Sequence, residues 1–137
     1  IELYPDLILA ANIHKDEVVP ELERRGFNVM TIDPEMLYEV MDSILQIGEA
    51  TGRSEAAAHL VAQMRARIDA VKATVGSLPE SDKPGVLYIT FHDPIWTLGK
   101  GTLTHELIET AGGRNIMADI DGNAPTDLET IICHSTL

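Results

Sequence analysis

The residues best suited to chemistry in this chain are His92 and Asp93, which are adjacent, and Trp96, which follows them closely. An imidazole and a carboxylate are common metal ligands, but two ligands leave a coordination shell incomplete. His14 could complete the shell only if the two halves of the chain closed on each other. We therefore predict no metal site and no intrinsic cofactor. Trp96, the only tryptophan, is a large apolar ring that either fills the core or forms the wall of a ligand site. The sequence leaves both roles open.

Other reactive motifs are incomplete. Residues 99–102 (GKGT) lack the earlier glycine and the hydroxyl residue directly after the lysine that a phosphate-binding loop needs. His105 and Glu106 begin a pattern like that of zinc proteases, but Glu109 stands where the second histidine belongs. No serine lies in a Gly-x-Ser-x-Gly setting. We therefore predict no catalytic residues.

The elements around Trp96 are expected to position it. Residues 86–89 are apolar and β-forming and predict a strand that is covered on both faces. Residues 91–100 then form a loop, and a helix follows that Thr102 or Thr104 caps and that Gly112-Gly113 ends. In open α/β sheets, loops that follow strands in this way build ligand sites. The loop carrying Trp96 is therefore the best candidate for a binding site.

The rest of the chain alternates strands and helices. A strand, a short helix that closes on Gly26 and a second strand predict a parallel β-α-β unit. Two long helices follow, and the second would be roughly 30 Å or more in length. The predicted ranges are a strand at 3–11, a helix at 16–25, a strand at 27–32, a helix from the Asp33-Pro34 cap to Thr51-Gly52, a helix at 54–76, and a polar exit from 77 onward.

Composition excludes several classes of partner. The formal net charge is −12, and the ten Lys and Arg residues form no run. Nucleic acids and anionic lipid surfaces require basic patches, so we expect neither as a partner. Cys133 is the single cysteine, which excludes an internal disulfide and leaves the default role of a small buried hydrophobe. No apolar run reaches the ~20 residues of a membrane span.

Three segments together carry a resemblance to a known family. They are YPDLILAANIHKDEVVPELERRGFNVMTIDP, LYEVMDSILQIGEATGRSEAAAHLVAQMRARIDAVKATV and VLYITFHDPIWTLGKGTLTHELIETAGGRNIMAD. In this order and spacing they resemble the solute-binding proteins of ABC importers, in the class that carries ferric siderophores, haem or cobalamin between two lobes joined by one long helix. The resemblance implies an α/β fold of two Rossmann-like lobes with largely parallel sheets, both incomplete in this chain.

The resemblance also implies domain boundaries and ligand contacts. Residues 1–53 would belong to the N-terminal lobe, 54–76 to the helix between lobes, 77–83 to a connector and 84–137 to the C-terminal lobe. Some cobalamin binders carry aromatic residues where this chain has Ala11 and Asn123. The implied ligand contacts are Ala11, Asn12, Ile13 and His14 from one lobe, and Phe91, His92, Asp93, Pro94, Ile95, Trp96 and Asn123 from the other.

An ABC permease is the implied macromolecular partner, and Glu129 in PTDLETII matches the docking glutamate of the second lobe. Spacing alone favours an ordinary solvated glutamate. The implied location is extracytoplasmic, periplasmic or lipid-anchored, with the signal segment upstream of Ile1. We expect incomplete sheets to expose edges that favour self-association of the fragment. The alternative function is a two-lobe α/β metal-dependent enzyme that uses His92 and Asp93.

Overall fold

The computed structural model describes residues 3–135. Its contacts divide the chain into two compact units, Ile1–Pro34 and Glu35–Leu137. Each unit contains both helices and strands, so the predicted α/β class is confirmed. The sheets are small and of both kinds, two parallel pairs and one antiparallel sheet, and they are not the largely parallel sheets of the prediction.

The first unit is the predicted β-α-β unit. Strand β1 (Ile8–Ala11) pairs in parallel with β2 (Val29–Ile32), and Ala11 lies opposite Ile32. Between them lie the short 3₁₀ helix η1 (Asn12–His14) and helix α1 (Val18–Arg24). Gly26 ends the helix with a φ of +85°, a left-handed conformation that favours glycine. The first strand is shorter than predicted because residues 3–7 do not pair.

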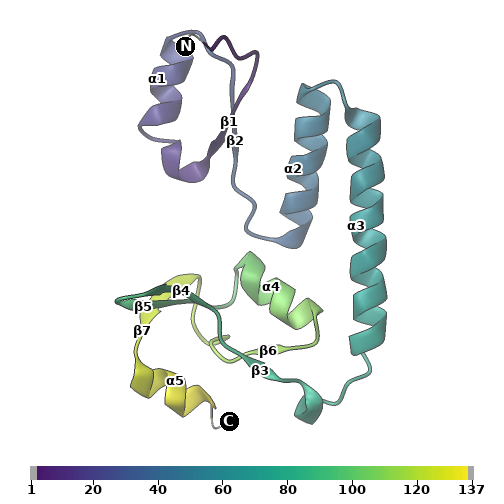
Figure 1. Ribbon diagram of the computed structural model, residues 1–137, viewed down its shortest axis with the longest axis vertical. Coiled ribbons are helices and arrows are strands. Elements are labelled where there is room, and N and C mark those ends of the chain that lie inside the picture. The colour runs from purple at the N-terminus through teal and green to yellow at the C-terminus, as the bar shows by residue number, and fades with distance from the viewer. Residues whose placement is uncertain (1–2, 136–137) are drawn as a thin grey trace. The chain divides into compact units, whose positions relative to one another are not determined.

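Two long helices begin the second unit and lie side by side (Figure 1). They are α2 (Leu37–Ala50) and α3 (Ser54–Val75), and Gly52 turns the chain between them with a φ of +67°. Helix α3 is continuous over the predicted range. Not all of its apolar residues are buried, because Leu60 and Val71 are exposed. The packed core consists of Leu37, Met41 and Val61, surrounded by Ile44, Leu45, Met64, Ile68 and Leu103.

Helix α2 begins later than predicted, and Asp33 does not cap it. The N-cap residue is Met36, whose side chain accepts no hydrogen bond. Two glutamates satisfy the free N–H groups instead. The carboxylate of Glu39 accepts from the backbone of Met36 at 3.1 Å, and that of Glu106 accepts from Leu37 at 2.7 Å. A carboxylate from a distant helix therefore fixes the start of α2.

The segment predicted as a loop over residues 91–100 is instead a β-hairpin. Strand β4 (Ile89–His92) and strand β5 (Ile95–Leu98) pair antiparallel across a two-residue turn. Strand β7 (Asn123–Thr126) pairs with the other side of β5, which gives the order β4-β5-β7. The hairpin forms because the β-forming residues of β5 follow directly on the turn residues Asp93 and Pro94.

The predicted strand at 86–89 is divided between two sheets. Strand β3 (Gly85–Val86) pairs in parallel with β6 (Arg114–Asn115), and β4 starts only at Ile89. This segment is not covered on both faces, since Tyr88 and Ile89 are about half exposed. A second 3₁₀ helix, η2 (Glu80–Asp82), precedes β3.

Two further helices complete the second unit. Helix α4 (Leu103–Thr110) is capped by Thr102, whose hydroxyl accepts a hydrogen bond from His105 N. It ends before Gly112, as predicted, with a φ of +83°, and a side chain there would meet Val75 of α3 at 2.7 Å. Helix α5 is Leu128–Ser135. Cys133 is exposed on α5, so its predicted burial is wrong.

The side chain of Asn115 connects four parts of this unit. It is 2% exposed, and its Nδ2 donates to the carbonyl of Leu98 at 2.9 Å and faces His105 Nδ1 at 3.3 Å. Its Oδ1 accepts from Met117 N at 3.1 Å. The side chain amide thereby joins β6, the end of β5, α4 and the segment after β6.

We expect Asn115→Leu to lower the free energy of unfolding by about 3 kcal/mol or more, because it leaves the Leu98 carbonyl and the Met117 N–H buried without partners. Chemical denaturation followed by circular dichroism measures the change. Thr126→Val is the control, since Thr126 Oγ1 is buried and has no hydrogen-bond partner in the described structure. That variant should be as stable as the parent or more so. Equal stability of the Asn115 variant and the parent would contradict this role.

Candidate functional site

The predicted contacts in the first unit lie together at the carboxyl end of β1. Ala11 is the last residue of that strand, and Asn12, Ile13 and His14 form η1 directly after it. All four are exposed, and Ile13 is 86% exposed. A turn at the carboxyl end of a parallel strand is where α/β folds present ligand contacts.

The predicted contacts in the second unit lie on the hairpin and on β7. Phe91 and His92 end β4, Asp93 lies in the turn, Trp96 is in β5 and Asn123 begins β7. Trp96 is therefore in a strand, not on a connection as predicted. Trp96 is partly buried, and Thr97, which follows it, is completely buried.

A β-bulge places Phe91 beside Trp96. Ile89 is opposite Thr97, but Phe91 is opposite Trp96, so β4 has one extra residue over this interval. Residues two apart on a regular strand share a face, and the bulge breaks that rule. The Thr90 hydroxyl donates to the Trp96 carbonyl at 3.3 Å at this irregularity. As a result Phe91 shares the face of Trp96, while Ile89 shares that of the buried Thr97.

Strand β7 extends the same face. Pro125 is opposite Trp96, and Asn123 is opposite Leu98. Directly opposed residues in an antiparallel sheet project from one face. The face therefore brings together the predicted Phe91, Trp96 and Asn123, and it adds Leu98 and Pro125, which the sequence analysis missed. Exposed and partly buried residues alternate along β7. This alternation places Pro125 beside Trp96 only when the pairing of β7 with β5 is known.

Polar groups surround the turn of this hairpin. His92 and Asp93 are exposed, and the ring of His92 lies 5.3 Å from that of Phe91, measured between centroids, at an angle of 42°. Within residues 3–135 the structure brings no three His, Cys, Asp or Glu side chains together in a group that could hold a metal ion. The turn can therefore offer one imidazole and one carboxylate beside an apolar surface.

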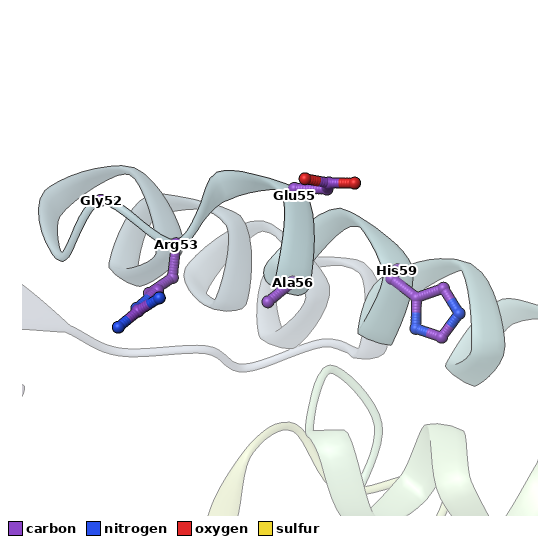
Figure 2. Close-up of a pocket in the computed structure, with 5 residues that line it drawn as sticks. All are labelled: Gly52, Arg53, Glu55, Ala56 and His59. Carbon is purple, nitrogen blue, oxygen red and sulfur yellow. The ribbon is translucent and has the colours of Figure 1, made fainter.

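A separate hollow of about 420 Å³ lies at the start of α3. It is lined by Gly52, Arg53, Glu55, Ala56 and His59, and Figure 2 shows that their side chains do not converge on one point. None of the sequence-predicted site residues lines it. Nothing in its chemistry distinguishes it from a groove at a helix terminus.

The predicted docking residue, Glu129, is exposed in the first turn of α5. The carboxylate of Asp127 caps this helix by accepting from Thr130 N at 2.7 Å, and this bond lowers the pKa of Asp127. At the other end His134 Nδ1 lies 2.8 Å from the Thr130 carbonyl, and Nε2 lies 3.1 Å from Asp119. Both partners accept, so the two bonds together require the protonated imidazolium.

Comparison with known proteins identifies the chain. The profile of the family described as periplasmic binding protein matches residues 1–134. The chain belongs to this family. The predicted resemblance is therefore confirmed, and the family is one of binding proteins, not of enzymes.

Three similar proteins show the extent of the similarity. A cobalamin-binding protein of Halobacterium salinarum is 34% identical over 124 residues, which are 88% of this chain and 32% of the relative. YvrC of Bacillus subtilis, an ABC transporter substrate-binding lipoprotein, is 29% identical and is matched over 96% of this chain and 44% of its own. A crystal structure of a possible iron-binding (periplasmic solute-binding) protein of Staphylococcus epidermidis is 27% identical, with a TM-score of 0.78 over 95% of this chain and 52% of its own.

The chain spans only about half the length of the matched crystal structure, and less of the two relatives. Within the part of the chain that the structure describes, no helix is both long and apolar enough to cross a membrane.

We expect the attachment of α5 to weaken as the pH rises. The Thr130 carbonyl and the Asp119 carboxylate raise the pKa of His134 above its ordinary value of 6.5, and the hydrogen bond from His134 lowers the pKa of Asp119 below 3.8. The His134 contribution to stability is complete below its ordinary pKa and is lost as the pH rises through the raised value. The Asp119 contribution is present above its ordinary pKa and is lost as the pH falls through the lowered value.

Nuclear magnetic resonance titration of the His134 ring, together with the amide protection factors of α5, measures this dependence. Asp119→Asn should shift the pKa of His134 back toward 6.5, because it removes the carboxylate that faces Nε2. A pKa of His134 at or below 6.5 in the parent would refute the bonding described above.

Proposed function

We propose that this protein is the extracytoplasmic substrate-binding component of an ABC importer, which captures a metal chelate between two lobes and delivers it to the permease. Membership of the periplasmic binding protein family supports this proposal. So does the similarity to a substrate-binding lipoprotein of an ABC transporter. The lipoprotein is also consistent with a protein that acts outside the cytoplasm, either free or anchored by a lipid.

The observation that carries the proposal is the exposed apolar face of the β4-β5-β7 sheet at the predicted position. Contiguous apolar patches on a protein surface often mark binding sites. Phe91 is 54% exposed beside Trp96, Asn123 lies on the same face, and Asp93 lies in the adjoining turn. Apolar walls with a few polar groups are typical of small-molecule sites.

The proposed ligand is a metal chelate of the cobalamin, haem or ferric siderophore type. One relative binds cobalamin and another is a possible iron-binding protein, as their names state. In this proposal Trp96 forms an apolar wall, and His92, Asp93 and Asn123 supply polar contacts. Ala11, Asn12 and His14 supply contacts from the other lobe.

The proposed domain layout follows the same family. Residues 1–53 belong to the N-terminal lobe, α3 at 54–76 connects the lobes, residues 77–83 form a connector and residues 84–137 begin the C-terminal lobe. The continuity of α3 over Ser54–Val75 supports its role as a stiff connector. An enzyme that uses His92 and Asp93 is not retained, because the family consists of binding proteins.

Titration of the full-length protein with cyanocobalamin, haemin and a ferric hydroxamate siderophore tests the proposal. We expect tight binding of at least one of them without turnover. Trp96→Ala should weaken that binding about 30-fold, because a buried tryptophan contact is typically worth about 2 kcal/mol. Calorimetry is the measurement, since the substitution removes the only tryptophan. Tyr38→Ala, an exposed aromatic truncation on α2, is the control and should bind as the parent does. Failure to bind any of the three would contradict the proposal.

Permease docking is tested by Glu129→Arg. In a reconstituted importer we expect ligand-stimulated ATP hydrolysis to require about tenfold more binding protein, because the reversed charge would repel cationic residues of the permease. Ligand affinity should not change. The control is Glu49→Arg, which reverses an equally exposed charge at the carboxyl end of α2. Equal stimulation by both variants would show that Glu129 is an ordinary surface glutamate.

A further inference from the structure

The side chain of Glu106 bonds α4 to the start of α2. Its carboxylate accepts a hydrogen bond from the Leu37 N–H at 2.7 Å, and the two residues are 69 positions apart in the chain. The first N–H groups of a helix have no acceptor within that helix, so a side chain has to supply one. A carboxylate at this end also interacts favourably with the positive end of the helix dipole. A single side chain therefore makes a charge-assisted bond between two distant helices.

This bond lies where the first unit joins the second. The first unit ends at Pro34. Because the two units are consecutive stretches of the chain, residues 3–135 pass from one to the other only here. The carboxylate of Glu39 accepts from the N–H groups of the two residues before Leu37, at 2.7 and 3.1 Å, and Glu106 holds the next N–H. Glu39 belongs to α2 itself, so Glu106 is the residue that ties this junction to another helix.

The same turn of α4 is fixed to the end of β5. Thr102 caps α4, and its hydroxyl donates to the carbonyl of Gly99, which directly follows β5, at 2.7 Å. His105 Nδ1 faces the side chain amide of Asn115, and this amide donates to the last carbonyl of β5. The first turn of α4 therefore connects the junction with the first unit to the hairpin.

We propose that Glu106 is a positioning residue for ligand binding, which holds the contacts of the first unit in place by fixing the start of α2. This inference rests on the proposed function, in which Asn12 and His14 contact the ligand from the first unit and Trp96 contacts it from the second. If the connection between two sets of contacts is loose, binding has to order that connection at a cost in entropy. Neither the family match nor the predicted contacts assign a binding role to Glu106.

Leu103 keeps α4 in place when Glu106 is replaced. Its side chain packs against the core formed by Leu37, Met41 and Val61, and this packing does not involve the hydrogen bond. Glu106→Ala should therefore remain folded and lose only the fixed start of α2. Glu106→Gln is the matched variant, because its amide oxygen can still accept a hydrogen bond from Leu37 N.

Affinity measurements on the full-length protein test this inference, with cyanocobalamin, haemin and a ferric hydroxamate siderophore as the probes. For the probe that the parent binds most tightly, we expect Glu106→Ala to weaken binding about tenfold. Glu106→Gln should stay within about threefold of the parent, and Glu49→Ala, an exposed truncation on α2, should have no effect. Hydrogen exchange of the Leu37 amide in the ligand-free protein should become at least about tenfold faster in Glu106→Ala, but not in Glu106→Gln.

Double-mutant cycles distinguish positioning from general stability. In an Asn12→Ala/His14→Ala background the contacts of the first unit are already lost, so Glu106→Ala should weaken binding by less than about threefold further. In a Trp96→Ala background its effect should remain about tenfold, because the hairpin stays attached to α4. An equal effect of Glu106→Ala in both backgrounds overturns the positioning role.

The outcomes separate this inference from the proposed function. If the parent binds none of the three probes, the proposed function fails and this inference falls with it. If the parent binds a probe and Glu106→Ala binds it equally well, the proposed function stands and the role of Glu106 is overturned. Parental affinity of the Asn12→Ala/His14→Ala variant also overturns that role, because the first unit then supplies no contact to position.

Discussion

The second unit depends on satisfying one buried amide, the side chain of Asn115. A buried donor or acceptor without a partner costs more than a hydrogen bond returns, so each group around this amide must keep its place. The carbonyl of Leu98 is the last of β5, and Met117, whose N–H bonds to Asn115, is completely buried. Asn115 therefore fixes where β5 ends relative to α4. The position of Trp96, two residues before that end, follows from this constraint.

The proposed ligand face depends equally on the register of the hairpin. A one-residue slip of β5 would turn Trp96 inward and Thr97 outward. The Thr97 hydroxyl opposes such a slip, because it donates to the Tyr88 carbonyl at 2.9 Å inside the unit. The bulge in β4 then brings Phe91 to the outer face. Phe91 and Trp96 lie opposite one another there, because Thr97 is anchored inside and β4 contains one extra residue.

Local signals in the sequence predicted the helices well and the sheets poorly. Gly52 and Gly112 marked the ends of α2 and α4 because a left-handed stop is a property of a few neighbouring residues. The cap of α2 was wrong because Glu106, which bonds to Leu37, lies in a helix far along the chain. The hairpin and the face shared by Trp96 and Pro125 depend on which strands pair, and periodicity within one strand does not contain that information. The family resemblance identified Phe91, Trp96 and Asn123 as candidate residues. Only the strand register of the structure shows that they share one face.

The proposed ligand contact and the proposed docking residue belong to consecutive elements. Asn123 begins β7, and Asp127 directly follows this strand and caps the helix that carries Glu129. No flexible linker separates the two elements, because Asp127 directly follows the strand and its carboxylate accepts a hydrogen bond from Thr130 N in the first turn of α5. The far end of α5 is held by the bond between His134 and Asp119. A displacement of β7 must therefore either move α5 or break one of these bonds. In the proposed function, this connection gives the permease-facing helix a direct mechanical link to the strand that contacts the ligand.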